Sequence, residues 1–188
     1  MILLRPALAY AAPPGRYERR RRPRRFVYPA AEVAALVLVG GCVAEFGVTL
    51  DGLAAIVFCL GLVLITVTDL EYHVVPNRVV LPAAGIVLVL RTAAHPTAEW
   101  AIAGLAAAGV LFVFALVNPN GLGMGDVKLA LLIGFMLGRH AVLGLALGMV
   151  AAIVPAVVIL VRHGRAGRSI GIPYAPFLAL GSVVALFV

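Results

Sequence analysis

The chain has 188 residues, of which 63% are hydrophobic and only 12% carry a formal charge. Soluble domains are nearer half apolar and a quarter charged, so this composition excludes a stable water-soluble fold and indicates a membrane protein. The net charge of +7 does not point to nucleic acid, because the arginines gather at one end and in loops, where membrane topology accounts for them. The apolar runs are continuous rather than alternating, which favours transmembrane helices over a β-barrel.

The chain begins with a stretch rich in proline and arginine, residues 1–29. We expect a disordered cytoplasmic tail that contacts anionic lipid. Its short apolar run, residues 2–12, precedes the basic cluster and is too short to span a bilayer. This order is the reverse of a secretory signal, so no such signal is predicted.

Residues 30–188 are predicted to form one transmembrane domain, an all-α polytopic bundle of six or seven helices. A spanning helix needs about 20 residues. Two of the apolar segments are shorter than this, and we expect them to be extended by a flank, tilted or shielded by protein. The segments are 30–50, 52–69, 78–91, 98–117, 127–138, 140–161 and 172–188.

Charge predicts the orientation of these segments. If the tail is cytoplasmic and seven segments cross in turn, thirteen lysines and arginines lie on the cytoplasmic side and two, Arg91 and Arg139, on the other. This asymmetry satisfies the positive-inside rule. We therefore expect a multi-pass protein of the inner (cytoplasmic) membrane, with its N-terminus, Asp69 and Asp126 on the cytoplasmic side.

Asp69 and Asp126 each lie at the boundary of an apolar run, where carboxylates are costly and by default mark function. Two carboxylates held together share one proton, so that one can take a proton from water while the other polarises a peptide carbonyl. Gly121, Gly123 and Gly125 precede Asp126, and would allow a substrate strand to approach the main chain closely. The plainer alternative is a flexible loop with a helix cap.

Three motifs then carry a resemblance to a known family. Residues 69–77 (DLEYHVVPN) look like the first-aspartate motif of type IV prepilin peptidases, and residues 123–129 (GMGDVKL) look like the second. Residues 172–178 (IPYAPFL) are similar to the family's C-terminal Pro-rich motif. The motifs occur in the family's order, and the resemblance covers residues 35 to 188.

This resemblance implies a membrane aspartic endopeptidase of the Gly-x-Gly-Asp type that removes the basic leader of prepilins at the cytoplasmic face. Asp69 and Asp126 would be its catalytic pair, whereas Glu71 is expected to be solvated or to help bind the leader. Lys128 is either a topological charge or a cation that tunes the pair. Residues expected to bind substrate or support the site are Pro76, Asn77, Gly123, Gly125, Lys128, Pro173 and Pro176.

The expected partners are prepilin substrates, membrane lipids and the pilus secretion machinery, with no nucleic acid. The four histidines lack metal-ligand spacing, so neither a metal nor a cofactor is expected. The longer family members carry two Cys-x-x-Cys pairs linked to N-methylation, and this chain has only Cys42 and Cys59, which we expect in the core. The sequence therefore predicts a peptidase without methyltransferase activity, resembling the compact tight-adherence (Flp-type) class.

Two alternatives stay open at this point. One is a different Gly-x-Gly-Asp membrane protease resembling presenilin or signal peptide peptidase, although the Pro-Ala-Leu motif that those proteins carry near the C-terminus does not occur in the C-terminal part of this chain, where the only such triplet is residues 6–8 in the tail. The other is a small proton-coupled transporter, since paired membrane carboxylates can relay protons. Against the transporter, both aspartates are expected at one face, and no internal repeat is visible.

Overall fold

The computed structural model describes residues 27–117, 122–163 and 173–188, which form α-helices and no strand. The all-α polytopic membrane bundle predicted from composition is thereby confirmed, with five helical stretches long and apolar enough to cross a membrane and one shorter apolar helix. The predicted tail, residues 1–29, lies outside the described residues except for its last three, with which the first helix begins. The elements are α2 (Val27–Phe46), α3 (Leu50–Tyr72), α4 (Asn77–Ala94), α5 (Glu99–Val117), α6 (Met124–Leu137), η1 (Gly138–His140), α7 (Ala141–His163) and α8 (Ala175–Leu186).

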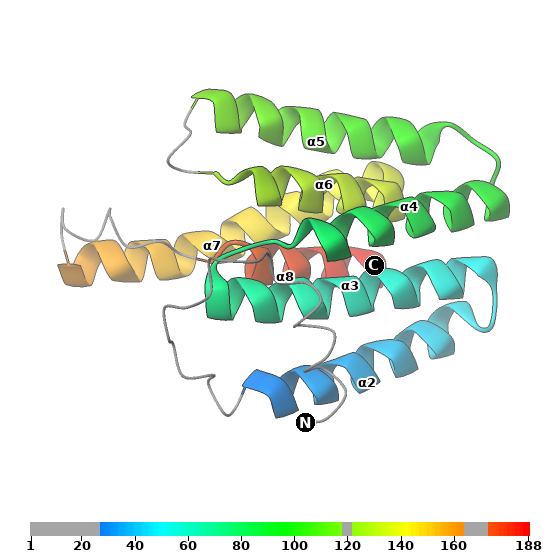
Figure 1. The fold of residues 1–188 in the computed structure, drawn as a ribbon, viewed down its shortest axis with the longest axis horizontal. Helices are drawn as coiled ribbons and strands as arrows, with labels where there is room; N and C mark the ends of the chain where they lie inside the picture. Colours follow the sequence, from blue (N-terminus) through cyan, green and yellow to red (C-terminus); the bar gives the residue numbers. More distant parts are fainter. Residues whose placement is uncertain (1–26, 118–121, 164–172) are drawn as a thin grey trace.

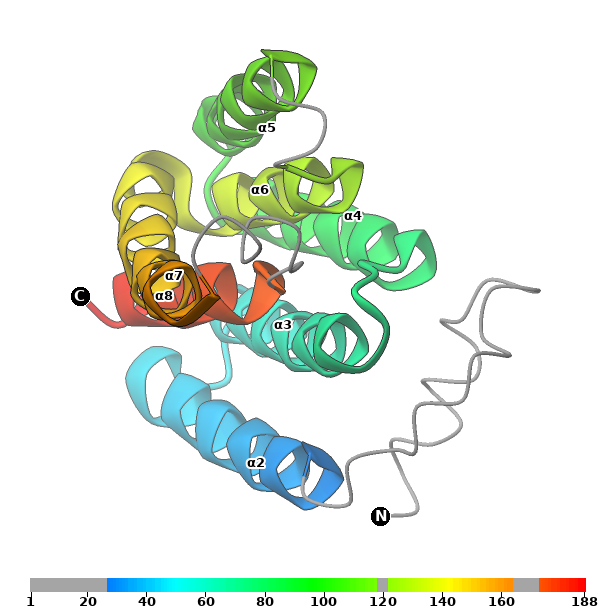
Figure 2. The same ribbon diagram turned by 90° about the vertical axis from the view of Figure 1, so that its left-hand side faces the viewer.

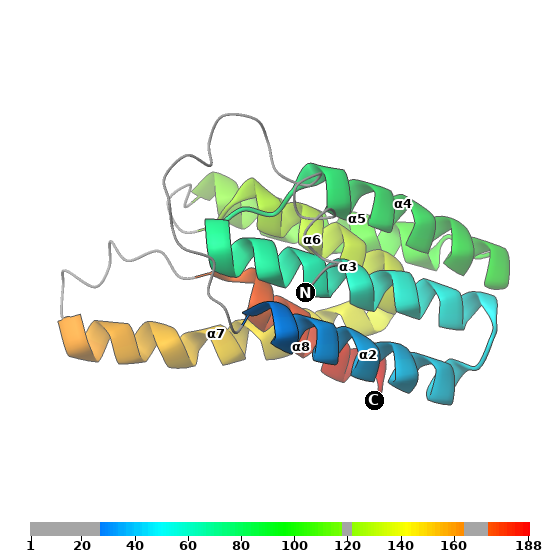
Figure 3. The same ribbon diagram turned by 60° about the horizontal axis from the view of Figure 1, so that its bottom comes forward.

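Successive helices run in opposite directions along the bundle (Figure 1). One end therefore collects the C-terminal ends of α3, α5 and α7 and the N-terminal ends of α4, α6 and α8. Seen from that end, α3, α6 and α8 lie in the middle, with α2 and α5 at opposite margins (Figure 2). The C-terminal half of α7 extends beyond the other helices (Figures 1 and 3).

Helix α6 is short because it lies inside the bundle. It has 14 residues, about 21 Å of helix, which is less than the hydrocarbon core of a bilayer. Ten of these residues are buried, and α6 packs on α3, α4, α5, α7 and α8. Protein therefore shields this segment, which was one of the three outcomes expected for a short run.

Glycine lets the helices approach closely where lipid offers no hydrophobic driving force. A Cβ on Gly134 of α6 would clash with the backbone of Gly104 on α5. A Cβ on Gly181 of α8 would clash with the backbone of Gly144 and Gly148 on α7. These contacts fix α5 against α6 and α8 against α7, so they position the helix ends described below.

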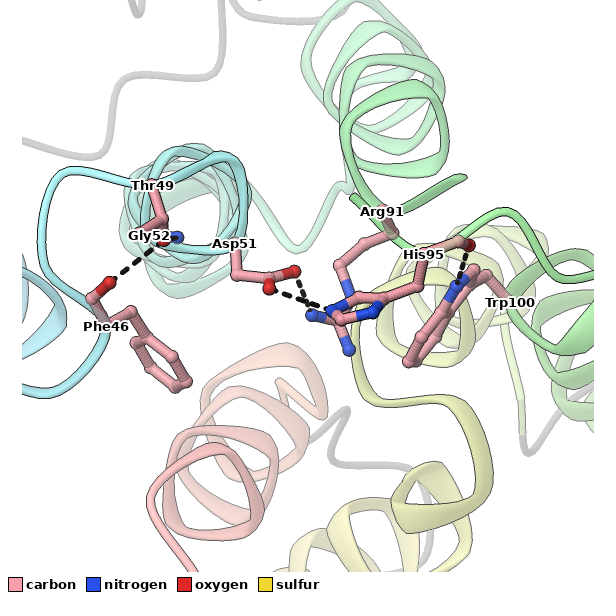
Figure 4. A network of polar contacts seen from close by, with 7 residues as sticks. All are labelled: Phe46, Thr49, Asp51, Gly52, Arg91, His95 and Trp100. Atoms are coloured by element: carbon pink, nitrogen blue, oxygen red, sulfur yellow. Dashed lines mark hydrogen bonds and ion pairs between the residues drawn. The ribbon is translucent and has the colours of Figure 1, made fainter. Parts of the chain in front are cut away.

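A polar cluster ties the opposite end of the bundle together (Figure 4). Asp51, in the first turn of α3, accepts a hydrogen bond from Arg91 of α4 and pairs with Nε2 of His95 at 2.9 Å. The guanidinium of Arg91 stacks 3.8 Å from the ring centre of Trp100, whose indole N–H donates to the carbonyl of His95. The sequence placed Arg91 at this end by charge alone and gave no reason to pair it with Asp51.

Candidate active site

The C-terminal end of α3 and the N-terminal ends of α6 and α8 lie at the same end of the bundle (Figures 1 and 2). Asp69 is in the last turn of α3 and Asp126 is in the first turn of α6. Asp69 is 6% exposed and Asp126 is 9% exposed, so both residues are buried within the protein. The alternating crossings bring together two residues that are 57 positions apart in sequence.

The end of α3 positions Asp69. His73 adopts the left-handed conformation (φ 53°, ψ 44°), and its N–H donates to the carbonyl of Asp69 at 2.9 Å. This conformation is uncommon for a residue with a Cβ and ends the helix. A second hydrogen bond comes from a segment distant in sequence: the N–H of Ala175, at the start of α8, donates to Oδ2 of Asp69 at 3.0 Å.

Asp126 is held by the start of its own helix. The N–H of Gly123 donates to Oδ2 of Asp126 at 3.3 Å, and the N–H of Asp126 donates to the carbonyl of Gly123 at 3.0 Å. Gly123 has no side chain, so this is the carboxylate half of a capping box. Asp126 and Asp69 are thus each held by a main-chain donor, the N–H of Gly123 and the N–H of Ala175.

The two glycines of the second motif differ in what surrounds them. A Cβ on Gly125 would lie 2.8 Å from Cβ of Val75, because the loop between α3 and α4 packs directly on the start of α6. A Cβ on Gly123 would meet Oδ2 of Asp126 at 3.6 Å, an ordinary contact. Gly125 is therefore required by packing and Gly123 is not, while Gly121 lies outside the described residues.

The first motif continues into α4 and contacts α6 again. Pro76 is buried at the N-cap of α4, and its carbonyl accepts the N–H groups of Val79 and Val80. Asn77 is exposed at the first position of α4 and accepts a hydrogen bond from Nζ of Lys128 at 2.7 Å. The ammonium group of Lys128 thus links α6 to α4 at the edge of the site.

The last motif brings α8 to the pair. Pro176 is in the first turn of α8, and Pro173 precedes the helix. Pro176 also borders an apolar groove of about 830 Å³ between α2, α3 and α8, which reaches Leu70, the residue after Asp69. Glu71 is half-buried in the final turn of α3.

Two contacts of this site were not predicted from the sequence. Ala175 and Val75 are apolar residues, and they act through a backbone N–H and through shape, neither of which a residue pattern displays. Their positions inside the Pro-rich and first-aspartate motifs were the available signal. Within the described ranges, no three His, Cys, Asp or Glu side chains cluster as a metal site would require.

The chain is 34% identical over 85% of its length to a prepilin leader peptidase/N-methyltransferase of Bacillus subtilis. It is 33% identical over 97% of its length to a protein of the same name from Burkholderia pseudomallei, and 31% identical over 85% to one from Stutzerimonas stutzeri. The matches cover 65%, 61% and 57% of those relatives, so the chain spans about three fifths of their length.

No solved structure matches the chain. The model of the type IV leader peptidase family matches residues 56–161, which is more than half of the chain and includes both Asp69 and Asp126. With these motifs carried by helices that meet at one end of a membrane bundle, the chain belongs to the type IV leader peptidase family.

Proposed function

We propose that this protein is an aspartic endopeptidase that removes the leader peptide of prepilins, with Asp69 and Asp126 activating a water molecule. The observation that supports the proposal is that two buried aspartates, in the last turn of α3 and the first turn of α6, lie at the end of the bundle where these helices and α8 pack together. The names of the relatives, prepilin leader peptidase/N-methyltransferase, support the choice of substrate.

The reaction follows from two carboxyl groups that share one proton. The ionised partner takes a proton from water as the water oxygen attacks the scissile carbonyl, and the protonated partner donates to the carbonyl oxygen. Collapse of the tetrahedral intermediate breaks the C–N bond: the leaving amine takes the proton that the first carboxyl group received from water, and a hydroxyl of the intermediate returns a proton to the second carboxylate. The low-dielectric surroundings strengthen the interaction between the two groups, so they act as one unit.

We propose that the site faces the cytoplasm. Arg78, Lys128 and Arg162 belong to the end of the bundle that holds the aspartates, whereas Arg91 and Arg139 belong to the opposite end. This distribution satisfies the positive-inside rule for an inner-membrane protein. Alkaline phosphatase, which is active only outside the cytoplasm, should be active when fused after Thr97 and inactive when fused after Val75; the reverse pattern would overturn the orientation.

The cleavage test is co-expression with a prepilin, with the pilin mass read by mass spectrometry. Wild type should shorten the pilin to its mature length, and Asp69→Asn or Asp126→Asn should leave it intact while the protein still accumulates in the membrane. Asp51→Asn is the matched control, because it makes the same substitution in the same helix, in the first turn of α3 at the opposite end of the bundle, and should leave cleavage intact. Cleavage by Asp69→Asn or Asp126→Asn would overturn the assignment.

The mass spectrum of the pilin also tests the expectation that this protein does not methylate the trimmed pilin. We propose that the chain trims without methylating, as in the compact Flp-type class, because it contains no Cys-x-x-Cys pair and only three residues join α2 to α3. The pilin should then have the mass of the trimmed chain. An added mass of one methyl group would overturn this part of the proposal.

Membrane lipids and the pilus secretion machinery are the further partners that we propose.

A further inference from the structure

Helix α8 reaches the site through one main-chain group. The N–H of Ala175 donates to Oδ2 of Asp69 across 106 positions of sequence, and both residues are buried. This bond links the Pro-rich motif to the first aspartate without any polar side chain from α8.

The first turn of α8 leaves this donor free for Asp69. The first N–H groups of a helix have no acceptor inside the helix. Here Pro176 has no N–H, and the N–H groups of Phe177 and Leu178 both donate to the carbonyl of Tyr174 at 3.1 Å. Of the groups at positions 175 to 177, the N–H of Ala175 is therefore the one directed at the carboxylate.

The start of α8 is also held firmly in place. A Cβ on Gly148 of α7 would lie 2.7 Å from Cα of Leu178, so the two helices touch through main chain one turn below Ala175. The hydroxyl of Ser182 donates to the carbonyl of Leu178 at 2.6 Å and is itself fully buried. A helix fixed in this way can hold a carboxyl group in one orientation.

We propose that the Ala175 N–H is a positioning group that fixes the Asp69 carboxyl group toward Asp126 for the peptidase reaction. The inference rests on the proposed function and goes beyond it by giving α8 a defined role. It also explains Pro176, which fits a first-turn position and removes a competing donor.

The sharpest test replaces the N–H of Ala175 by an oxygen atom, which also makes the Tyr174 carbonyl a weaker acceptor, an effect that the control below shares at its own preceding carbonyl. Lactic acid, the α-hydroxy analogue of alanine, is placed at position 175 by nonsense suppression, which exchanges the N–H for an ester oxygen and keeps the methyl group. The matched control is the same ester at Ala179, one turn along the same helix, where the lost N–H belongs to the helix interior. Both proteins are purified, and kcat and KM are measured with a prepilin alongside thermal unfolding.

The ester at 175 should lower kcat by roughly 10- to 100-fold with KM unchanged, because misplacing a catalytic group by a fraction of an ångström acts on the chemical step. The ester at 179 should keep the wild-type kcat in the folded protein. Equal kcat values for the two esters would overturn the inference while leaving the proposed function intact. Failure of the folded wild type to cleave would overturn the proposed function itself.

A second pair of variants covers the case in which the ester at 175 does not accumulate. Ala175→Pro removes the same N–H but disfavours the helical conformation of Tyr174 (φ −85°, ψ −32°), so activity is normalised to folded protein. Ala175→Gly retains the N–H while removing the methyl group. Per folded protein, Ala175→Pro should lose activity and Ala175→Gly should retain it. Equal activity of the two would overturn the inference.

Discussion

Replacing Gly125 by alanine should disable the site through a contact that contains no catalytic group. The added Cβ would lie 2.8 Å from Cβ and 3.0 Å from Cγ2 of Val75. Apolar carbons normally sit about 3.5–4.0 Å apart, so the shortfall is about 1 Å. Rotating the Val75 side chain does not relieve it, because the position of a Cβ is set by the backbone. Either the loop after Asp69 or the start of α6 must therefore move.

A shift of about 1 Å at a reacting group can cost roughly 100-fold in rate. Overpacking of this kind also costs about 1–3 kcal/mol of stability. We therefore expect Gly125→Ala to lower the cleavage rate of purified protein by roughly 100-fold with a modest fall in melting temperature. The assay is the initial rate of prepilin cleavage in detergent, normalised to folded protein.

Two controls test the reasoning. Gly123→Ala should stay close to wild type, because its Cβ meets Oδ2 of Asp126 at 3.6 Å and its φ of −83° suits alanine. Val75→Gly should restore activity to Gly125→Ala, since the nearest remaining atom is Cα at 3.7 Å. Val75→Ala should not, because the Cβ remains. Rescue by both changes at Val75, or a wild-type rate for Gly125→Ala, would refute the steric account.

Three further predictions concern packing and charge away from the reacting groups. Asp51→Ala should lower the free energy of unfolding by about 2 kcal/mol without changing kcat of the folded protein. An unchanged melting temperature would show that the polar cluster around Asp51 does not stabilise the bundle. The Lys128–Asn77 hydrogen bond is exposed, so a double-mutant cycle of Lys128→Met and Asn77→Ala should give a coupling energy below about 1 kcal/mol. A large loss of kcat in Lys128→Met would show instead that Lys128 acts on the aspartate pair. Gly104→Val would push into the Phe135 ring and should lower the melting temperature by separating α5 from α6; a wild-type melting temperature would speak against that contact.

The helices were predictable because continuous apolar runs in a membrane protein have few alternatives. Their ends were harder. The run predicted to stop at residue 69 continues to Tyr72, since Asp69 and Glu71 belong to the helix and the turn comes at His73. Likewise the run predicted from residue 127 begins at Met124, because Gly123 serves as the N-cap. Charge marks where lipid contact ends, whereas caps and backbone conformation decide where a helix ends.

The candidate site was also predictable only in part. The alternation of membrane crossings along the sequence predicted that Asp69 and Asp126 lie at one end of the bundle. The donor from Ala175 and the contact between Val75 and Gly125 needed the structure, because both come from the main chain or the shape of apolar residues. The pairing of Asp51 with Arg91 and His95 could not be predicted either, since these residues lie 40 and 44 positions away in the sequence.

The central claim, that Asp69 and Asp126 form one catalytic unit, is tested most directly by comparing single and double variants. Cleavage rates of purified Asp69→Asn, Asp126→Asn and the double variant are measured on one prepilin at matched amounts of folded protein. Groups that act as a unit give non-additive losses, so all three variants should fall to the same residual rate. A double variant far slower than either single variant, or a single variant that keeps the wild-type rate, would contradict the account.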